Sequence, residues 1–211
     1  MRAPRRRRER GVLWLTVRRG AANVSLPMTD DERLVRLLAE RSARRGNFTL
    51  ASGRQSTLYV DARLTSMAPE GQALIGRLGL ALIRDAGWRC DAVGGLTLGA
   101  DPIAYAICHA SAATPAPVRA FTVRKEAKAH GTGKLIEGPV AKGDHVVVVE
   151  DVITTGGSAA KAIEAIRREG MTPVAVLALV DREEGGREHL ESLGLPVRSL
   201  VKASQLVPLL G

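Results

Sequence analysis

The sequence contains no apolar run of the roughly 18 to 20 residues that a membrane-spanning helix requires. Cysteine is scarce, and the two that occur, Cys90 and Cys108, form neither a disulfide framework nor a metal-ligand pair. Histidine is equally uninformative, since His109, His130, His145 and His189 have no zinc-like spacing. We therefore expect a protein of a reducing, cytoplasmic compartment, with no membrane partner and no structural zinc.

Two common nucleotide-binding motifs are also missing. A Walker loop needs lysine before its hydroxyl residue, but Gly156-Gly157-Ser158 has none, and Gly133-Lys134 is followed by leucine. No G-x-G-x-x-G pattern follows an expected strand. Nucleoside triphosphatases and dinucleotide-dependent enzymes are therefore not supported.

Positive charge is abundant but unevenly placed. The formal net charge is +9, of which residues 1–27, with eight arginines and one glutamate, carry +7 and the rest +2. The basic segment could bind nucleic acid, act as a targeting peptide, or be an extension without a folded role upstream of a start at Met28. We expect the last: a disordered basic extension over 1–27 and a single domain over 28–211, with no nucleic-acid partner.

That domain has the pattern of an α/β fold. Hydrophobic residues make up 45% and charged residues 25% of the chain, as in one globular domain. Continuous apolar strands alternate with helices, which indicates a mostly parallel sheet covered on both faces. The expected elements are a helix from Thr29 to about 43, a strand and polar turn within 48–56, strands at 58–60, 91–95, 118–123, 146–149 and 174–180, and helices at 69–86, 101–110 and 158–169.

One long segment does not follow this alternation. Residues 124–138 read RKEAKAHGTGKLIEG, with four cationic side chains, one histidine and three glycines but no apolar face. A connection of this length without a core-facing pattern is either disordered or a functional lid. We call it the lid segment.

Residues 146–158, VVVVEDVITTGGS, are the most specific chemical signal. An apolar strand ends at two adjacent acids, Glu150 and Asp151, and leads through small hydroxyl residues and glycines into a helix. Glycines let backbone amides approach an anion, and the helix N-terminus adds a favourable dipole. Open α/β sheets bind ligands at the carboxyl ends of their strands. A phosphate site beside two acids indicates a phosphorylated sugar as the ligand.

This motif resembles the phosphoribosyl diphosphate-binding motif of type I phosphoribosyltransferases. Three further segments narrow the resemblance to the orotate phosphoribosyltransferases. They are RKEAKAHG at 124–131, similar to a flexible catalytic loop, FTLASGRQS at 48–56, similar to a substrate-side segment, and Asp181-Arg182 after the strand 174–180. The four motifs stand in the same order as in that family over roughly residues 30–200.

The resemblance implies a type I phosphoribosyltransferase-like fold, with a small N-terminal substrate-side hood and a flexible catalytic loop. It also implies transfer of the 5-phosphoribosyl group from phosphoribosyl diphosphate to orotate in pyrimidine biosynthesis, with Mg²⁺, by a homodimer. Lys125 and the lid segment would then serve the neighbouring subunit's site. Magnesium is expected near Glu150 and Asp151 through the diphosphate and water rather than through a defined protein ligand set.

The resemblance also assigns roles to individual residues. Lys128 and Asp151 are the expected catalytic residues. Contacts to phosphoribosyl diphosphate are expected from Arg124, Lys125, Lys128, His130, Glu150, Asp151, Val152, Ile153, Thr154, Thr155, Gly156, Gly157 and Ser158. Thr154 and Arg182 are expected to bind orotate, although Arg182 could instead pair with Glu183 or Glu184.

Two positions depart from the family pattern. Ala51 stands where many members have lysine, and the loop Leu96–Asp101 lacks a lysine that many members carry. Arg124 and Lys125 are the candidates for the missing charge. Two other functions remain open: a phosphoribosyltransferase for another base, which the lid sequence disfavours, and a nucleic-acid-binding regulator, which needs basic charge on the folded body.

Overall fold

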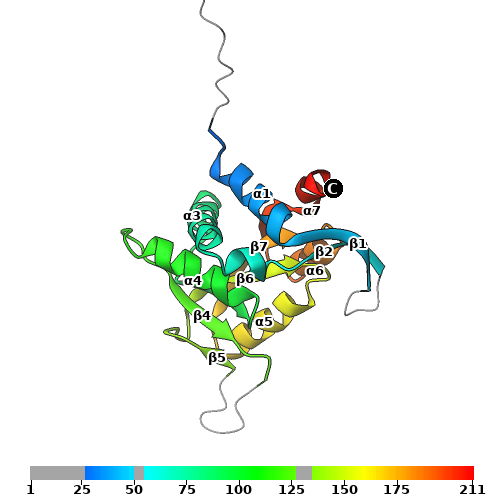
Figure 1. Ribbon diagram of the computed structural model, residues 1–211. Helices are drawn as coiled ribbons and strands as arrows, with labels where there is room; N and C mark the ends of the chain where they lie inside the picture. The colour runs from blue at the N-terminus through cyan, green and yellow to red at the C-terminus, as the bar shows by residue number, and fades with distance from the viewer. Residues whose placement is uncertain (1–26, 50–54, 127–134) are drawn as a thin grey trace, which may run out of the picture.

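The computed structural model describes residues 27–49, 55–126 and 135–211. Its main sheet has the strand order β5-β4-β3-β6-β7-β8, in which β5 alone is antiparallel to its neighbour (Figure 1). The strands are β3 (Ala92–Leu96), β4 (Arg119–Val123), β5 (Ile136–Glu137), β6 (His145–Ile153), β7 (Thr172–Asp181) and β8 (Val197–Lys202). The helices are α1 (Asp30–Arg41), α2 (Arg63–Ser66), α3 (Pro69–Asp85), α4 (Ala100–Ser111), α5 (Gly157–Arg168), α6 (Gly186–Ser192) and α7 (Ala203–Leu206), followed by a 3₁₀ turn at Val207–Leu209.

The sheet is buried on both faces, which explains its uninterrupted apolar strands. Val147 and Val149 of β6 pack in a core with α1, α3 and α4. The alternate residues Val146 and Val148 pack in a second core with α5 and α6. Because side chains alternate along a strand, every position of this segment of β6 must be apolar. The expected α/β class with a mostly parallel sheet is confirmed.

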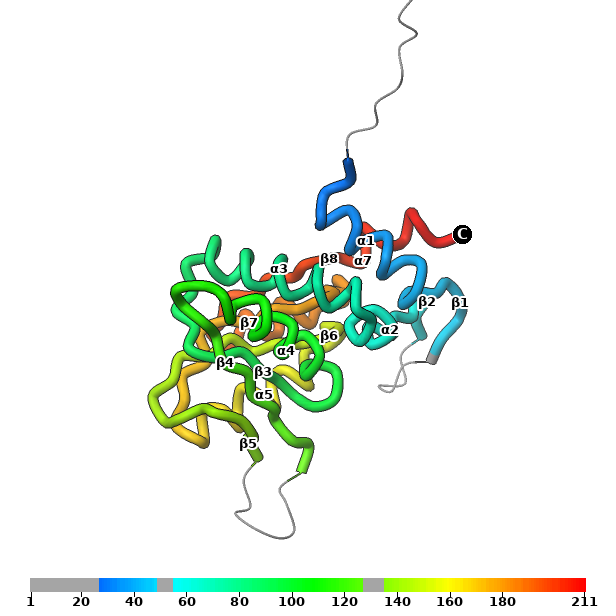
Figure 2. The backbone as a smooth tube through the Cα atoms, turned by 60° about the vertical axis from the view of Figure 1, so that its left-hand side comes forward, coloured from blue at the N-terminus to red at the C-terminus, as the bar shows by residue number. Residues whose placement is uncertain are grey.

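A small hairpin stands beside the main sheet. Its strands β1 (Ala43–Thr49) and β2 (Gln55–Val60) pair antiparallel, and it lies next to α1 at one end of the body (Figure 2). This hairpin is the hood that the sequence indicated. The capping box at the start of α1 is present, since Thr29 and Glu32 each accept a hydrogen bond from the other's backbone N–H.

The boundaries after α1 differ from the expectation. The helix ends at Arg41, and β1 begins at Ala43, which is buried against the core. The periodicity of α1 continues into β1, so the sequence does not mark this change. The short helices α2, α6 and α7 and the edge strand β8 are also absent from the expected elements, since short segments with mixed polarity have no clear period.

No helix in the described part of the chain is long and apolar enough to cross a membrane. The expected basic extension lies almost entirely outside the described residues.

Candidate active site

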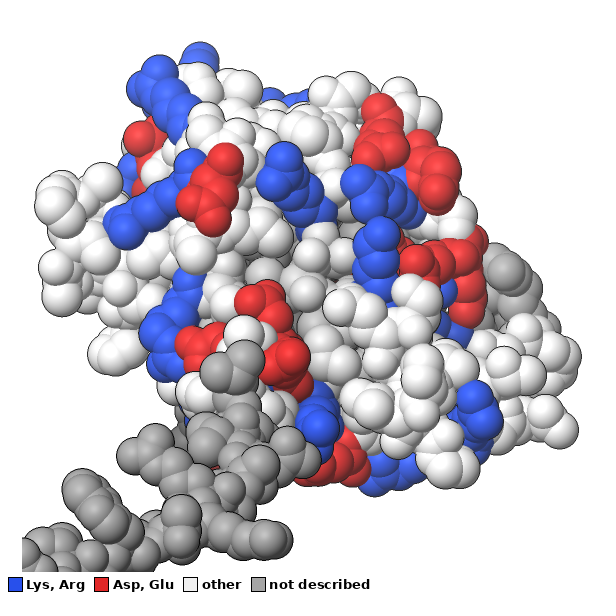
Figure 3. Space-filling view, turned by 90° about the horizontal axis from the view of Figure 1, so that it is seen from above, with Lys and Arg blue, Asp and Glu red and all other residues white. Residues whose placement is uncertain are grey.

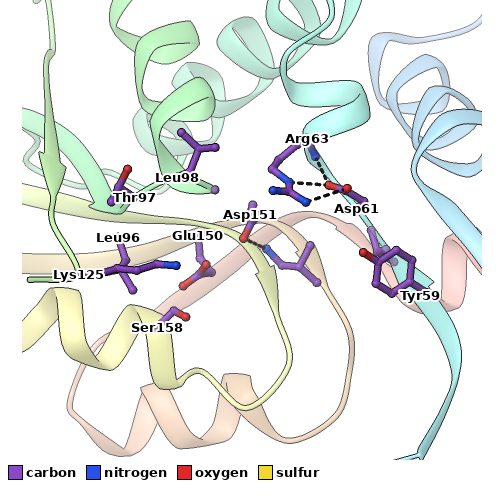
Figure 4. A pocket seen from close by; sticks show the side chains of 13 residues that line it. Tyr59, Asp61, Arg63, Leu96, Thr97, Leu98, Lys125, Glu150, Asp151 and Ser158 are labelled. Carbon is purple, nitrogen blue, oxygen red and sulfur yellow. Dashed lines mark hydrogen bonds and ion pairs between the residues drawn. The ribbon is translucent and has the colours of Figure 1, made fainter. Parts of the chain in front are cut away.

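The loop that follows β3 and the end of β6 face the end of β2 and the start of α2 at the carboxyl edge of the sheet. Between them lies an open cavity of about 290 Å³ (Figure 4). Its lining residues are Tyr59, Val60, Asp61, Arg63, Leu96, Thr97, Leu98, Gly99, Lys125, Glu150, Asp151, Val152 and Ser158. The cavity therefore joins residues that are up to 99 positions apart in sequence, from Tyr59 to Ser158.

Glu150 and Asp151 form the acidic part of the cavity wall, at the end of β6. Glu150 is buried, with 6% of its surface exposed, and its Oε2 has no hydrogen-bond partner among the described residues. Burial, and secondly the charge of Asp151, raise the pKa of Glu150 well above its usual value. Asp151 is half-buried, and its Oδ1 accepts a hydrogen bond from the Val152 N–H at 2.8 Å. A buried carboxylate oxygen without a partner is available to a ligand hydroxyl or to an ordered water.

The hydroxyl and glycine segment after β6 has the geometry of an anion site. Gly156 has a left-handed backbone, with φ 77°, and precedes the first turn of α5. The N-cap residue of this helix is Gly156, which has no side chain to cap it. The Ala159 N–H is directed at the Glu150 carboxyl, so the N–H groups that precede it in the first turn are the ones available to an anion. Thr155, Gly157 and Ser158 are exposed here, and Ser158 lines the cavity. The glycine turn and the helix start expected from the sequence are present, and phosphate binding at them stays a prediction.

Val152 and Ile153, at the start of this segment, have different surroundings. Val152 lines the cavity, whereas the Ile153 side chain is buried in the core with α5 and α6. Only the backbone of Ile153 belongs to the site, and its carbonyl accepts the Arg182 N–H at 2.9 Å. Ile153 thus has a packing role and positions the next loop. Thr154, expected to contact both substrates, is half-buried at the turn.

The loop between β3 and α4 forms another wall of the cavity. Asp101 is buried, with its two carboxylate oxygens accepting hydrogen bonds from Thr97 at 2.6 Å and Thr122 at 2.8 Å. Thr122 also shares a hydrogen bond with Tyr105 at 3.0 Å. Asp101 therefore ties the loop to α4 and to β4, and fixes the position of Thr97, Leu98 and Gly99 beside the acids.

Arg182 lies at the end of β7, where it joins the sheet to the hood. Its side chain is only 3% exposed, and its Nη2 donates to Ser56 of β2 at 2.6 Å and to Glu184 at 2.5 Å. The alternative pairing with a neighbouring acid is therefore formed in this structure. The Arg182 Nε is buried and has no partner among the described residues, so this donor is left for another acceptor.

The base of the lid segment is partly described. Arg124 pairs with Glu137 at 3.2 Å and borders an adjoining cavity of about 530 Å³ rather than the main one. Lys125 lines both cavities of its own chain. Lys128 and His130, as well as Ala51, lie outside the described residues.

Four residues of the cavity wall were not predicted from the sequence: Tyr59, Val60, Asp61 and Arg63. Tyr59 packs against Phe48 of β1, with ring centroids 5.3 Å apart. Asp61 and Arg63 form an ion pair, and the side-chain hydrogen bond from Arg63 lowers the pKa of Asp61. The Asp-x-Arg spacing directly after a strand was the available signal, because it allows a local carboxylate–guanidinium pair.

Comparison with known proteins agrees with this geometry. Residues 68–193 match the family model described as "Phosphoribosyl transferase domain". An orotate phosphoribosyltransferase of Aquifex aeolicus is 47% identical over 183 residues, which cover 85% of this chain and 99% of the relative.

Solved structures give the same result. The orotate phosphoribosyltransferase of Mycobacterium tuberculosis H37Rv, in complex with Fe(III) dicitrate, has a TM-score of 0.74 and 45% identity, covering 84% of this chain and 99% of that one. The same enzyme in complex with 5-phospho-alpha-D-ribosyl 1-diphosphate has a TM-score of 0.71 and 42% identity, covering 85% and 99%.

Proposed function

This chain belongs to the orotate phosphoribosyltransferase family, and we propose that its cavity is where a phosphoribosyl group passes from phosphoribosyl diphosphate to orotate. The products are orotidine 5'-monophosphate and pyrophosphate, in the de novo synthesis of UMP. The observation that carries this proposal is the pair Glu150 and Asp151 in the last part of β6, followed by the glycine turn that leads into the N-terminus of α5. An acidic pair beside an anion site suits the hydroxyls and the 5-phosphate of a ribose phosphate.

The chemistry is largely electrostatic. The bond between the anomeric carbon and the diphosphate oxygen breaks with its electron pair leaving on pyrophosphate. The ring nitrogen of orotate then bonds to that carbon and releases its proton. In the transition state the ribose gains oxocarbenium character and the leaving group gains negative charge, and the site must stabilise both while excluding water.

The residue roles follow from this charge distribution. Glu150 and Asp151 hold the ribose hydroxyls, and Asp151 faces the cationic sugar. The backbone of residues 154–158 binds the 5-phosphate. Lys128, with Arg124, Lys125 and His130, is proposed to meet the diphosphate.

Orotate recognition is assigned to Arg182. Its free Nε and its planar guanidinium suit the orotate carboxylate, which can accept two hydrogen bonds from such a group.

Magnesium is part of the proposal, and the residues fit it. Glu150 presents a buried carboxylate oxygen that has no hydrogen-bond partner within the described parts of the chain, beside Asp151. Oxygen ligands of this kind, with water and phosphate, are those that Mg²⁺ prefers. These two residues would hold the ion largely through water. When bound, magnesium neutralises charge on the diphosphate. Removal of the metal with EDTA should abolish turnover, and added Mg²⁺ should restore it.

We also propose that the enzyme is a cytoplasmic homodimer whose lid segments serve the opposite subunit. Support for a partner surface comes from the exposed apolar side chains Leu64, Met67, Leu98 and Tyr105, which lie on α2, α4 and the loops beside them. Support for a reducing compartment comes from Cys90 and Cys108, which are both free thiols.

The shared lid can be tested by mixing inactive chains. Lys128→Ala and Asp151→Asn subunits should regain activity in a mixed dimer, because one of its two sites then receives an intact lid and intact acids. A mixed dimer of Lys128→Ala and His130→Ala is the control and should stay inactive, because each lid is defective. No recovery in the first mixture, with dimer formation shown by light scattering, would contradict a shared lid.

The function itself is tested by following orotate consumption with phosphoribosyl diphosphate and Mg²⁺. We expect turnover by the wild type and at least a tenfold loss in Lys128→Ala, because one donor to a developing anion typically contributes on the order of a hundredfold. Turnover of a purine base in place of orotate would overturn the assignment.

A nucleic-acid-binding regulator is the less supported alternative. Basic and acidic side chains are interspersed on the face shown in Figure 3, rather than gathered in a basic surface. Binding of RNA or DNA by the protein without residues 1–27, in the absence of any base turnover, would favour that alternative instead.

A further inference from the structure

Among the described residues that line the cavity, cationic side chains are few and acidic ones stand close together. Asp61, Glu150 and Asp151 are acidic, whereas the cationic lining residues that the structure describes are Arg63 and Lys125. Phosphoribosyl diphosphate is anionic at both ends. Its 5-phosphate end is matched by the backbone of residues 154–158. Its diphosphate end would extend over Asp151 toward the β3–α4 loop, where Leu96–Asp101 contains no basic residue.

Arg63 stands at that end of the cavity. It opens α2, and its guanidinium reaches the cavity wall above Asp151, from the side of the hood, as Figure 4 shows. Gly99 lies against Asp151 from the neighbouring wall, which Leu98 also lines. Ser158 lies on one side of Asp151. A diphosphate bound over Asp151 on its other side would therefore lie between the β3–α4 loop and Arg63.

Asp61 fixes the direction in which Arg63 points. The Arg63 Nε donates to Asp61 Oδ1 at 2.8 Å, and Nη2 donates to Oδ2 at 2.9 Å. The Asp61 carboxylate also accepts the Arg63 backbone N–H at 3.2 Å. A guanidinium has five N–H donors, and among the described residues Asp61 accepts from only two of those of Arg63. The remaining donors are held in a fixed plane, and the side chain is 48% exposed.

We propose that Arg63 is a substrate-binding residue that contacts the diphosphate of phosphoribosyl diphosphate and replaces the side-chain charge missing from the β3–α4 loop. This rests on the proposed function. Arg63 suits the task because a planar guanidinium binds phosphate oxygens through two parallel hydrogen bonds, and because its pairing with Asp61 reduces the orientational freedom lost on binding. Asp61 is accordingly a positioning residue for Arg63.

The test is calorimetric binding of three separate ligands, each with Mg²⁺: phosphoribosyl diphosphate, inorganic pyrophosphate and ribose 5-phosphate. In Arg63→Ala we expect the Kd for the first two to rise at least about tenfold, the effect of losing a charged hydrogen bond. The Kd for ribose 5-phosphate should stay within about twofold. The Kd values of Arg63→Lys for phosphoribosyl diphosphate and pyrophosphate should lie between those of the wild type and of Arg63→Ala, because lysine keeps the charge but lacks the planar guanidinium.

Arg77→Ala is the matched control. Arg77 lies on α3, is 52% exposed, and pairs with Asp30 through Nε at 2.9 Å and Nη2 at 2.8 Å, outside the cavity. Its three Kd values should equal those of the wild type. If Arg63→Ala is unstable, Arg63→Gln removes the charge while keeping the Cβ and Cγ methylene groups and a polar end, with thermal unfolding followed for each variant.

Two results would overturn the role of Arg63. One is an unchanged Kd for pyrophosphate in a folded Arg63→Ala protein. The other is equal weakening for pyrophosphate and ribose 5-phosphate, which indicates a general distortion of the cavity. Failure of the proposed function is distinguishable, because it appears as absent orotate turnover in the wild type, whatever the diphosphate binding of Arg63 variants.

Discussion

Gly99 lies directly against Asp151: a Cβ on residue 99 would stand 2.4 Å from the carboxyl carbon and from Oδ2 of Asp151. Real Cβ atoms do not approach other atoms this closely. The β3–α4 loop can therefore lie beside Asp151 only because position 99 carries no side chain. This contact couples two walls of the active site.

Gly99→Ala should displace either the loop or the Asp151 carboxylate. We expect kcat/KM for phosphoribosyl diphosphate to fall at least tenfold, because a shift of about 1 Å in a reacting constellation has effects of this order or more. Circular dichroism and thermal unfolding should show a folded protein, since Gly99 lies outside the two cores. Wild-type kinetics in this variant would contradict the coupling.

Asp101 should hold the β3–α4 loop in position through its hydrogen bonds. Asp101→Ala removes the carboxylate that accepts from the half-buried Thr97 and Thr122 hydroxyls. Thr122 keeps its hydrogen bond to Tyr105, and a lost hydrogen bond to a charged group costs about 1.5–3 kcal/mol. We expect a lower free energy of unfolding in urea and a raised KM for phosphoribosyl diphosphate. Asp101→Asn keeps one acceptor oxygen and should show a smaller change in both. An unaltered KM in Asp101→Ala would show that the loop is held by other contacts.

Arg182 should govern the second substrate. Arg182→Ala removes the proposed carboxylate-binding group, so we expect the KM for orotate to rise at least tenfold with a smaller change for phosphoribosyl diphosphate. Arg182→Lys should rescue it only in part, since lysine cannot offer a planar fork. Steady-state kinetics with each substrate varied in turn measure this. If the KM for phosphoribosyl diphosphate rises more than the KM for orotate, Arg182 binds phosphoribosyl diphosphate rather than orotate.

Acid stability should depend on Asp144, which lies away from the site. The Ala141 N–H, at 2.7 Å from Oδ2, and then Arg119, at 3.0 Å from Oδ1, lower the pKa of Asp144. A depressed pKa means that the stabilisation is present above the unfolded-state value of about 3.9 and is lost as the pH falls through the lower folded value.

Asp144→Asn should therefore reduce the free energy of unfolding at pH 7 by on the order of 1 kcal/mol, and the gap from wild type should narrow below about pH 4. Urea unfolding over this pH range measures the effect. Glu169→Gln is the control, since the Glu169 side chain is exposed and has no polar partner within the described ranges. A gap that is constant with pH would exclude a contribution from this titration.

Much of the fold could be predicted from local patterns. The apolar run at 146–149 indicated a strand buried on both faces, and β6 is one, because alternate side chains need two apolar surroundings. The Glu150-to-Ser158 segment indicated an anion site for a similarly local reason: strand, acids, glycines and helix are consecutive in the chain. Segments without a clear period, such as α2 and the strand that follows α1 without a break, gave no such signal.

What the sequence determined by itself is the parallel sheet, the longer helices that alternate with its strands, and the glycine turn after β6, since each depends on neighbours within a few residues. Only the tertiary structure decided which distant residues share the cavity. Ser56 and Arg182 are 126 positions apart yet hydrogen-bonded, and Gly99 is in contact range of Asp151. Arg63 faces the acids because β2 and α2 fold back over the carboxyl edge of the sheet. Such contacts depend on how the layers pack, and packing is a property of the whole chain.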